Sequence, residues 1–219
     1  MQGLARVLSG DLDGGDASLQ DAARIAEEAG APDDLALAVC ERALLAMARS
    51  DWGQAEALAH QARTALHRAG IEESYATPLV CAVRARASLH RGDIPAARQE
   101  LVSAQRLRAL LTHALPHLAV QARIELARAH LTLGDLAGAR TLARKIDDLL
   151  HRRPGLGTAV DEVEALRDQL SKQLGSIVPG ASSLTGKTPS NADYPPIPVT
   201  PSDCRAARLL DRCPRPRIH

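Results

Sequence analysis

The sequence predicts an all-α fold, a tetratricopeptide-like α-solenoid of helix hairpins followed by a disordered C-terminal tail. Three observations lead to this prediction. Apolar residues recur at helical spacing on both sides of short turns, the turn motif itself repeats along the chain, and no run has the period of two that is typical of a strand. We assign residues 1–174 to the repeat domain and residues 175–219 to the tail.

The clearest hairpin lies in residues 123–150. One helix runs into Gly134 and Asp135, the chain turns, and a second helix leaves. Gly134 is suited to the positive φ that ends many helices. Asp135 is suited to accept a hydrogen bond from a free N–H at the start of the second helix. Ala139, a small residue, lets the two helices approach each other closely.

This turn recurs with an almost fixed period. Its aspartates are 40, 42 and 42 residues apart, and each is followed four positions later by glycine or alanine. The aspartates are Asp11, Asp51, Asp93 and Asp135, and the small residues are Gly15, Ala55, Ala97 and Ala139. A period of about 40 residues with helix–turn–helix content is typical of solenoids of the tetratricopeptide or HEAT kind. The strict tetratricopeptide period is about 34 residues, so longer helices are expected here.

Prolines, glycines and capping residues set the expected helix boundaries. Residues 1–30 form a hairpin whose first helix begins abruptly, barely two turns before Gly10, so we expect further sequence upstream. Thr77 is expected to cap its helix, with Pro78 at the first helical position. The last helix is amphipathic and is expected to act as a C-terminal lid. The helices after residue 30 are expected at 32–49, 51–69, 77–91, 95–111, 116–133, 136–151 and 158–174.

Composition narrows the function classes. Aromatic residues make up 1% of the chain and phenylalanine is absent, so leucine, alanine and valine must form the core. The net charge of +1 gives no strong field for nucleic acid or an acidic surface. Cys40 and Cys81 are expected to be buried thiols, while Cys204 and Cys213 lack the spacing of a zinc site. We expect a reduced, cytoplasmic chain, without a signal peptide or a membrane-spanning run.

Two motifs resemble sites but lack the context that the chemistry needs. Residues 181–188 fit the loose form of a phosphate-binding loop, but Pro189 and a proline-rich stretch follow where a helix should begin, so we interpret them as a chance match. His113 and His117 have the spacing of two metal ligands on one helix face. With Pro116 between them and no carboxylate nearby, surface or inter-repeat histidines are the simpler interpretation. We therefore predict no catalytic, metal-binding or cofactor-binding residue and no enzyme.

Residues 104–116 contain the candidate recognition residues. Arg106 and Arg108 are two apart and should point to different faces of the expected helix. An arginine in a groove is suited to bind an anion; the alternative is that both only solubilise the surface. We take Arg106, Arg108 and His113 as the candidate residues that bind a small-molecule effector or a protein partner on the concave face.

Several segments, taken in order, resemble the actinobacterial LuxR-type transcriptional regulators, in particular the large ATP-binding, MalT-like subgroup. The resemblance covers about residues 1–185. The segments that carry it are 104–116, 118–123, 133–140, 151–157, 162–167 and 181–185. It implies a three-part protein with an N-terminal ATPase, a helical repeat region that senses an inducer or partner, and a C-terminal helix-turn-helix. In this chain the ATPase and the helix-turn-helix are absent, so we expect no autonomous DNA binding.

The tail suggests a reason for the missing helix-turn-helix. Residues 203–207 can be encoded so that a one-base shift reads Ile-Ala-Glu-Arg-Leu, a string that the family's helix-turn-helix would supply at about this place. Our hypothesis is that residues from about Gly186 onward are translated out of frame. We therefore interpret the chain as a truncated sensor region, with self-association as a further expectation. The alternative is a free-standing tetratricopeptide-like adaptor that binds only proteins.

Overall fold

The computed structural model describes residues 11–111, 115–152 and 159–177, all within one compact unit, Met1–Pro179. Every regular element in these residues is a helix, which confirms the all-α prediction. The elements are α2 (Leu12–Glu28), α3 (Pro32–Ala48), α4 (Trp52–Arg68), α5 (Thr77–His90), α6 (Ile94–Arg106), the 3-10 helix η1 (Arg108–Leu110), α7 (Pro116–Thr132), α8 (Leu136–Arg152) and α9 (Ala159–Ile177). None of these helices is long and apolar enough to cross a membrane.

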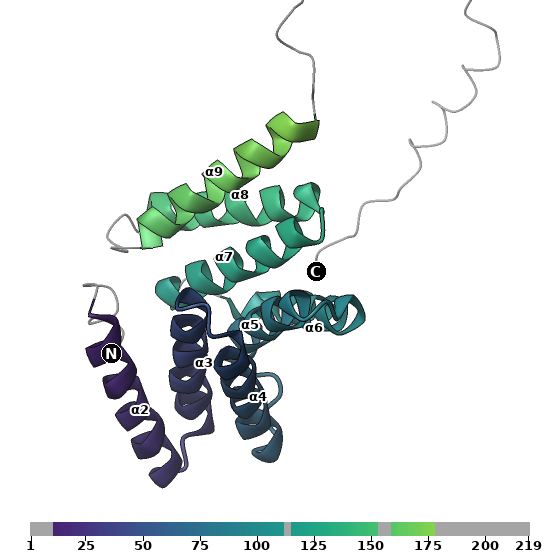
Figure 1. Ribbon diagram of the computed structural model, residues 1–219. Helices are drawn as coiled ribbons and strands as arrows, with labels where there is room; N and C mark the ends of the chain where they lie inside the picture. The colour runs from purple at the N-terminus through teal and green to yellow at the C-terminus, as the bar shows by residue number, and fades with distance from the viewer. Residues whose placement is uncertain (1–10, 112–114, 153–158, 178–219) are drawn as a thin grey trace, which may run out of the picture. The chain divides into compact units, whose positions relative to one another are not determined.

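Successive helices pack as hairpins, α3 with α4, α5 with α6 and α7 with α8, while α2 covers α3 (Figure 1). Helix α5 also packs against α3 and α7, and α7 packs against α9. Helices α3, α5, α7 and α9 therefore form an inner row, and α4, α6 and α8 pack outside it. Along α5 only Arg84, Arg86 and the last two residues are not buried, as expected of a helix with neighbours on several sides.

The outer helices bury a single stripe instead. In α8 the buried residues are spaced three or four apart, at Ala139, Ala143, Ile146 and Leu149. This is the pattern of an amphipathic helix with one face against the core and the other in solvent. Inner helices are therefore apolar around most of their circumference, whereas outer helices are apolar on one face. This difference determines whether a helix lies in the inner row or outside it.

The repeated aspartate caps its helix in every turn where it was predicted. Asp135 accepts a hydrogen bond from the Gly138 N–H at 2.8 Å, and Gly134 before it has a φ of 74°. The other three aspartates bond in the same way at 3.0 or 3.1 Å, Asp11 with Gly14, Asp51 with Gln54 and Asp93 with Ala96. In the turn between α3 and α4 the left-handed position is taken by Ser50, with a φ of 62°.

The small residues four positions after these aspartates lie where two helices meet. Ala55, Ala97 and Ala139 are fully buried, and Gly15 is buried as well. The core around them consists of alanine, leucine, valine and isoleucine, with the buried thiols of Cys40 and Cys81, as predicted. Among the described residues, Glu125 is the only charged residue that is fully buried.

One helix end and one helix cap in the middle of the chain differ from the prediction. The expected helix at 95–111 ends at Arg106, and the chain then tightens into η1, where the Leu110 N–H bonds to the Leu107 carbonyl at 2.9 Å. Arg106 and Arg108 therefore do not lie on one continuous helix. The cap of α5 is Ala76 and not Thr77, because Ser74 organises the preceding turn by accepting a hydrogen bond from the Ala76 N–H at 3.0 Å.

Helix α9 packs against both α7 and α8 at the end of the repeat region. Its apolar stripe of Val163, Leu166 and Leu170 is buried, so the predicted amphipathic helix is confirmed. The helix runs on through Gly175 to Ile177, beyond the expected end at about residue 174. The expected tail after Ile177, the helix before Gly10 and the phosphate-loop-like segment lie outside the described residues.

Candidate functional site

Helix α7 carries a row of polar side chains along one face. His117, Gln121, Glu125 and Arg128 are spaced four, four and three residues apart, which places them on one side of the helix. The rest of α7 is largely buried and apolar, as its place in the inner row requires. A polar residue at a core position must find partners, because a buried polar group without them is costly. We call these four residues the α7 row.

The Glu125 carboxylate, only 2% exposed, is paired with two arginines. Arg86 from α5 donates through Nη1 to Oε2, and Arg128 donates through Nη1 to Oε1 at 2.6 Å. One carboxylate oxygen thus binds each guanidinium. The two arginine side chains remain 22% and 24% exposed, so they reach from the buried carboxylate to the surface.

Helix α9 adds a second carboxylate to this group. Glu162 Oε2 lies 3.3 Å from Arg128 Nη1, and the Glu162 side chain is 46% exposed. Burial raises the pKa of Glu162, while the nearby Arg128 guanidinium opposes that rise. The bond between Arg128 and Glu162 is therefore longer and more exposed than the bond between Arg128 and Glu125.

At the next position of the row, Gln121 links α7 to α3. Its Nε2 donates to Glu41 Oε2 at 2.8 Å, across 80 positions of sequence. Burial raises the pKa of Glu41 to about 7; the Gln121 hydrogen bond opposes that rise, and the charges of Glu162 and Glu125 add to it. Gln121 Oε1 and both ring nitrogens of His117 are buried and have no hydrogen-bond partner among the described residues.

An aromatic pair adjoins Arg86. Trp52, the only tryptophan of the chain, begins α4, and its ring stacks on that of His90 with centroids 4.0 Å apart and planes 7° apart. The guanidinium carbon of Arg86 lies 5.8 Å from the centre of the Trp52 ring, within the range of a cation–π contact. Arg86 is therefore held between an aromatic ring and a buried carboxylate. We call Arg86, Arg128, Glu125, Glu162, Glu41, Gln121 and Trp52 the inner cluster.

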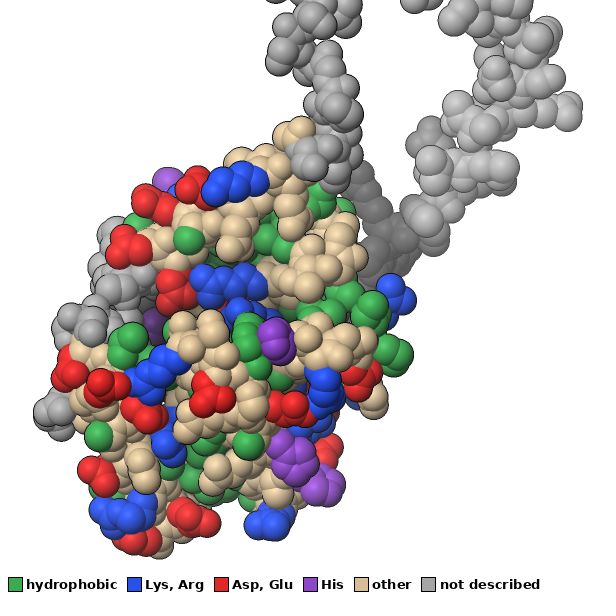
Figure 2. All heavy atoms as spheres, viewed as in Figure 1, with side chains coloured by type: hydrophobic (Ala, Val, Ile, Leu, Met, Phe, Trp, Pro, Cys, Tyr) green, Lys and Arg blue, Asp and Glu red, His purple; other side chains and the backbone are tan. Residues whose placement is uncertain are grey.

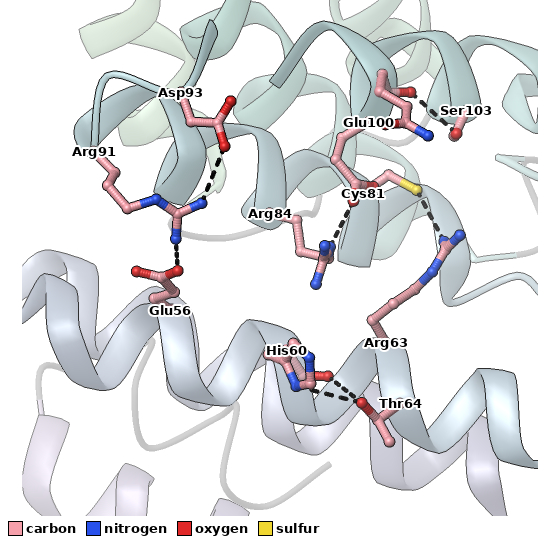
Figure 3. A network of polar contacts seen from close by, with 11 residues as sticks. Glu56, His60, Arg63, Thr64, Cys81, Arg84, Arg91, Asp93, Glu100 and Ser103 are labelled. Carbon is pink, nitrogen blue, oxygen red and sulfur yellow. Dashed lines mark hydrogen bonds and ion pairs between the residues drawn. The ribbon is translucent and has the colours of Figure 1, made fainter. Parts of the chain in front are cut away.

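The face of the molecule in Figure 2 carries basic and acidic side chains beside one another, without a large patch of one sign. A second polar network, between α4, α5 and α6, shows how such pairs join neighbouring hairpins (Figure 3). There Arg91 of the α5–α6 turn binds Glu56 of α4, and Arg84 of α5 binds Glu100 of α6 at 2.6 Å. Each of these pairs bridges two helices that already pack together, so we interpret this network as structural.

A cysteine in that network has no chemical role that its surroundings favour. The Arg63 Nη1 atom lies 3.6 Å from the Cys81 sulfur. Burial nevertheless raises the pKa of Cys81 to about 12, with Glu100 adding to the rise and Arg63 opposing it. The thiol therefore stays protonated at neutral pH and is a poor nucleophile.

Of the three predicted recognition residues, the described part of the structure includes the side chain of Arg106 alone. Arg106 is exposed at the end of α6, an outer helix, and not on the inner row. Arg108 lies in η1 and its side chain is outside the described part of the structure, as is His113. His117 is half-buried near the start of α7. No group of three or more metal-ligating side chains occurs among the described residues.

Sequence reasoning missed the α7 row. Its spacing of His, Gln, Glu and Arg within an apolar helix was the available signal. Comparisons of the chain with protein-family models and with curated proteins return no significant match. The inner cluster contains paired charges and hydrogen bonds joined to an aromatic wall. Such an arrangement is suited to recognition through ionic and hydrogen-bonding contacts.

Proposed function

We propose that this chain is the effector- or partner-binding helical repeat region of a LuxR-type transcriptional regulator, and that the inner cluster is its recognition surface. One observation carries the proposal. An inner helix, α7, bears four polar residues on one face, of which Glu125 is fully buried and the other three are half-buried. Three of the four contact α3, α5 or α9. An apolar replacement for a buried ion pair is often neutral or stabilising, so packing alone does not call for Arg86 and Glu125.

The regulator context is supported by the ordered resemblance over residues 1–185, and by an architecture of stacked hairpins that suits a sensor region. In this role the chain binds a small effector or a protein at the inner row and passes the bound state to neighbouring segments. Reading the nucleotide sequence around this chain in three frames tests the context. An ATPase frame upstream and a helix-turn-helix in a shifted frame are expected. Finding neither would favour the adaptor alternative.

The binding role is tested with three forms of the full chain, immobilised and exposed to the small molecules and proteins of the encoding organism. They are the unchanged chain, Arg128→Gln in the inner cluster and Arg24→Gln on the exposed surface of α2. Arg24 is the matched control, because it is also an arginine paired with a glutamate on its own helix. A bound species should be retained by the unchanged chain and Arg24→Gln and lost from Arg128→Gln. Equal retention on all three would refute the inner cluster as the recognition surface.

A further inference from the structure

We propose that Arg86 and Arg128 form a binding site for a carboxylate group of a ligand, and that Glu162 of α9 occupies this site as an internal competitor. The inference rests on the proposed function, because it names the chemical class that the same surface recognises.

The buried Glu125 carboxylate positions the two arginines. Glu125 is buried and holds one guanidinium on each of its oxygens, so the two planar groups are fixed beside each other. A guanidinium has five N–H donors in a rigid fork. The contacts with Glu125 use only Nη1 of each arginine, and the contact with Glu162 uses the same Nη1 of Arg128. These contacts leave other N–H groups of the two guanidiniums unused, and both side chains are already held in place, which lowers the ordering cost of binding a second acceptor.

The carboxylate that the arginines already bind on their exposed side indicates the class of ligand. The structure places a carboxylate, that of Glu162, on the outward side of the pair, 3.3 Å from Arg128. Arg86 and Arg128 balance the charges of Glu125 and Glu162, so exchange of Glu162 for a ligand carboxylate leaves the charge of this group unchanged. The two carboxylates of the group also differ in exposure. Glu125 is 2% exposed and Glu162 is 46% exposed, so only Glu162 is readily displaced.

Displacement of Glu162 by a ligand would change the contacts at the start of α9. Glu162 lies in the first turns of α9, directly before the buried Val163. Further along, α9 keeps a second ion pair, between Arg167 and Asp147 of α8. A ligand that replaces Glu162 therefore releases a contact at the start of α9, while Arg167 and the apolar stripe still hold the helix. Occupancy of the site is thereby linked to the helix that ends the described repeat region.

Trp52 provides the measurement, because it is the only tryptophan and lies beside Arg86. Its fluorescence is recorded while succinate, a short oligoglutamate peptide or inorganic phosphate is added to the full chain at constant ionic strength. The variants are Glu162→Gln, Arg128→Gln and, as a matched control, Glu164→Gln, which changes an exposed glutamate of the same helix. Circular dichroism verifies that each variant keeps its helix content.

Removing the competitor should strengthen binding. We expect Glu162→Gln to bind the carboxylate probes roughly two- to fivefold more tightly than the unchanged chain, the factor that corresponds to one weak, exposed ion pair. Glu164→Gln should bind as the unchanged chain does, and Arg128→Gln should lose binding. Binding of succinate alone identifies a small organic acid as the source of the carboxylate, and binding of the peptide alone identifies an acidic protein segment.

Three outcomes would overturn the inference: no fluorescence response from either the unchanged chain or Glu162→Gln, equal affinity in Glu162→Gln and Glu164→Gln, or phosphate binding as tight as carboxylate binding. The Glu162→Gln variant remains decisive if Arg128→Gln unfolds, because it alters a half-exposed side chain that makes one long ion pair. A species captured in an Arg128-dependent manner, without any carboxylate response, would leave the proposed function standing and remove this inference alone.

Discussion

Glu41 should make the stability of this protein depend on pH in the direction opposite to most surface carboxylates. Its pKa is raised from the ordinary 4.5 to about 7, first because the carboxylate is buried, and then because Glu162 and Glu125 are negative neighbours. The hydrogen bond from Gln121 only partly offsets this rise. At pH 6 the folded chain therefore keeps a proton on Glu41 that the unfolded chain has released.

The sign and size of the effect follow from this difference. A group with a raised folded-state pKa stabilises the fold fully below pH 4.5 and loses this contribution as the pH rises to about 7. Each unit of difference between the folded-state and unfolded-state pKa corresponds to about 1.4 kcal/mol of unfolding free energy. The stabilisation lost over this pH window is therefore on the order of 3 kcal/mol. At about one pH unit above this pKa the carboxylate is charged in the folded chain as well, and the contribution no longer changes.

Glu41→Gln isolates this contribution, because an amide carries no titrating proton. The amide oxygen can still accept from Gln121 Nε2. Its N–H groups can donate to Gln121 Oε1, which is buried and has no partner within the described part of the chain. Urea denaturation of both chains between pH 4 and pH 8 gives the difference in unfolding free energy. As the pH rises across this range, the unfolding free energy of Glu41→Gln should increase relative to that of the unchanged chain by on the order of 3 kcal/mol. Glu28→Gln, on the exposed surface of α2, is the control.

Parallel pH profiles for Glu41→Gln and the unchanged chain would refute the reasoning. They would mean that Glu41 is as well solvated in the folded chain as in the unfolded one. A pH dependence that also disappears in Glu28→Gln would assign the effect to the overall charge and not to the contact between α3 and α7.

Two further predictions concern the repeated turn. Ala139→Leu places a large side chain at the close contact between α7 and α8, where Ala139 is fully buried. In a denaturation experiment it should lower the unfolding free energy by about 1–3 kcal/mol. The control Ala137→Leu, at an exposed position of the same helix, should change the unfolding free energy little. Asp93→Ala removes the cap that binds the Ala96 N–H and should cost about 1 kcal/mol. A lower thermal midpoint in Asp93→Ala with unchanged helix content would agree with that value, whereas an unaltered midpoint would contradict the capping role.

The candidate site also shows the reach of sequence patterns. The spacing of the α7 row is visible in the sequence, and it predicts that these side chains share a helix face. It does not reveal what they contact. For Arg106 and Arg108, which are two positions apart, the sequence left an anion-binding groove and a solubilising surface as alternatives. In the structure α6 ends at Arg106, and Arg106 is exposed on this outer helix.

The fold class, the hairpin period and the capped turns were determined by the sequence, because each depends on residues within a few positions of one another. The aspartate caps bind an N–H three residues ahead, and helical periodicity repeats every three or four residues. The inner cluster was decided only by the tertiary structure. Its bonds join residues 34, 39 and 80 positions apart, and their formation depends on how the inner helices are rotated and offset against each other. That register is set by packing over the whole core, and no local pattern of residues specifies it.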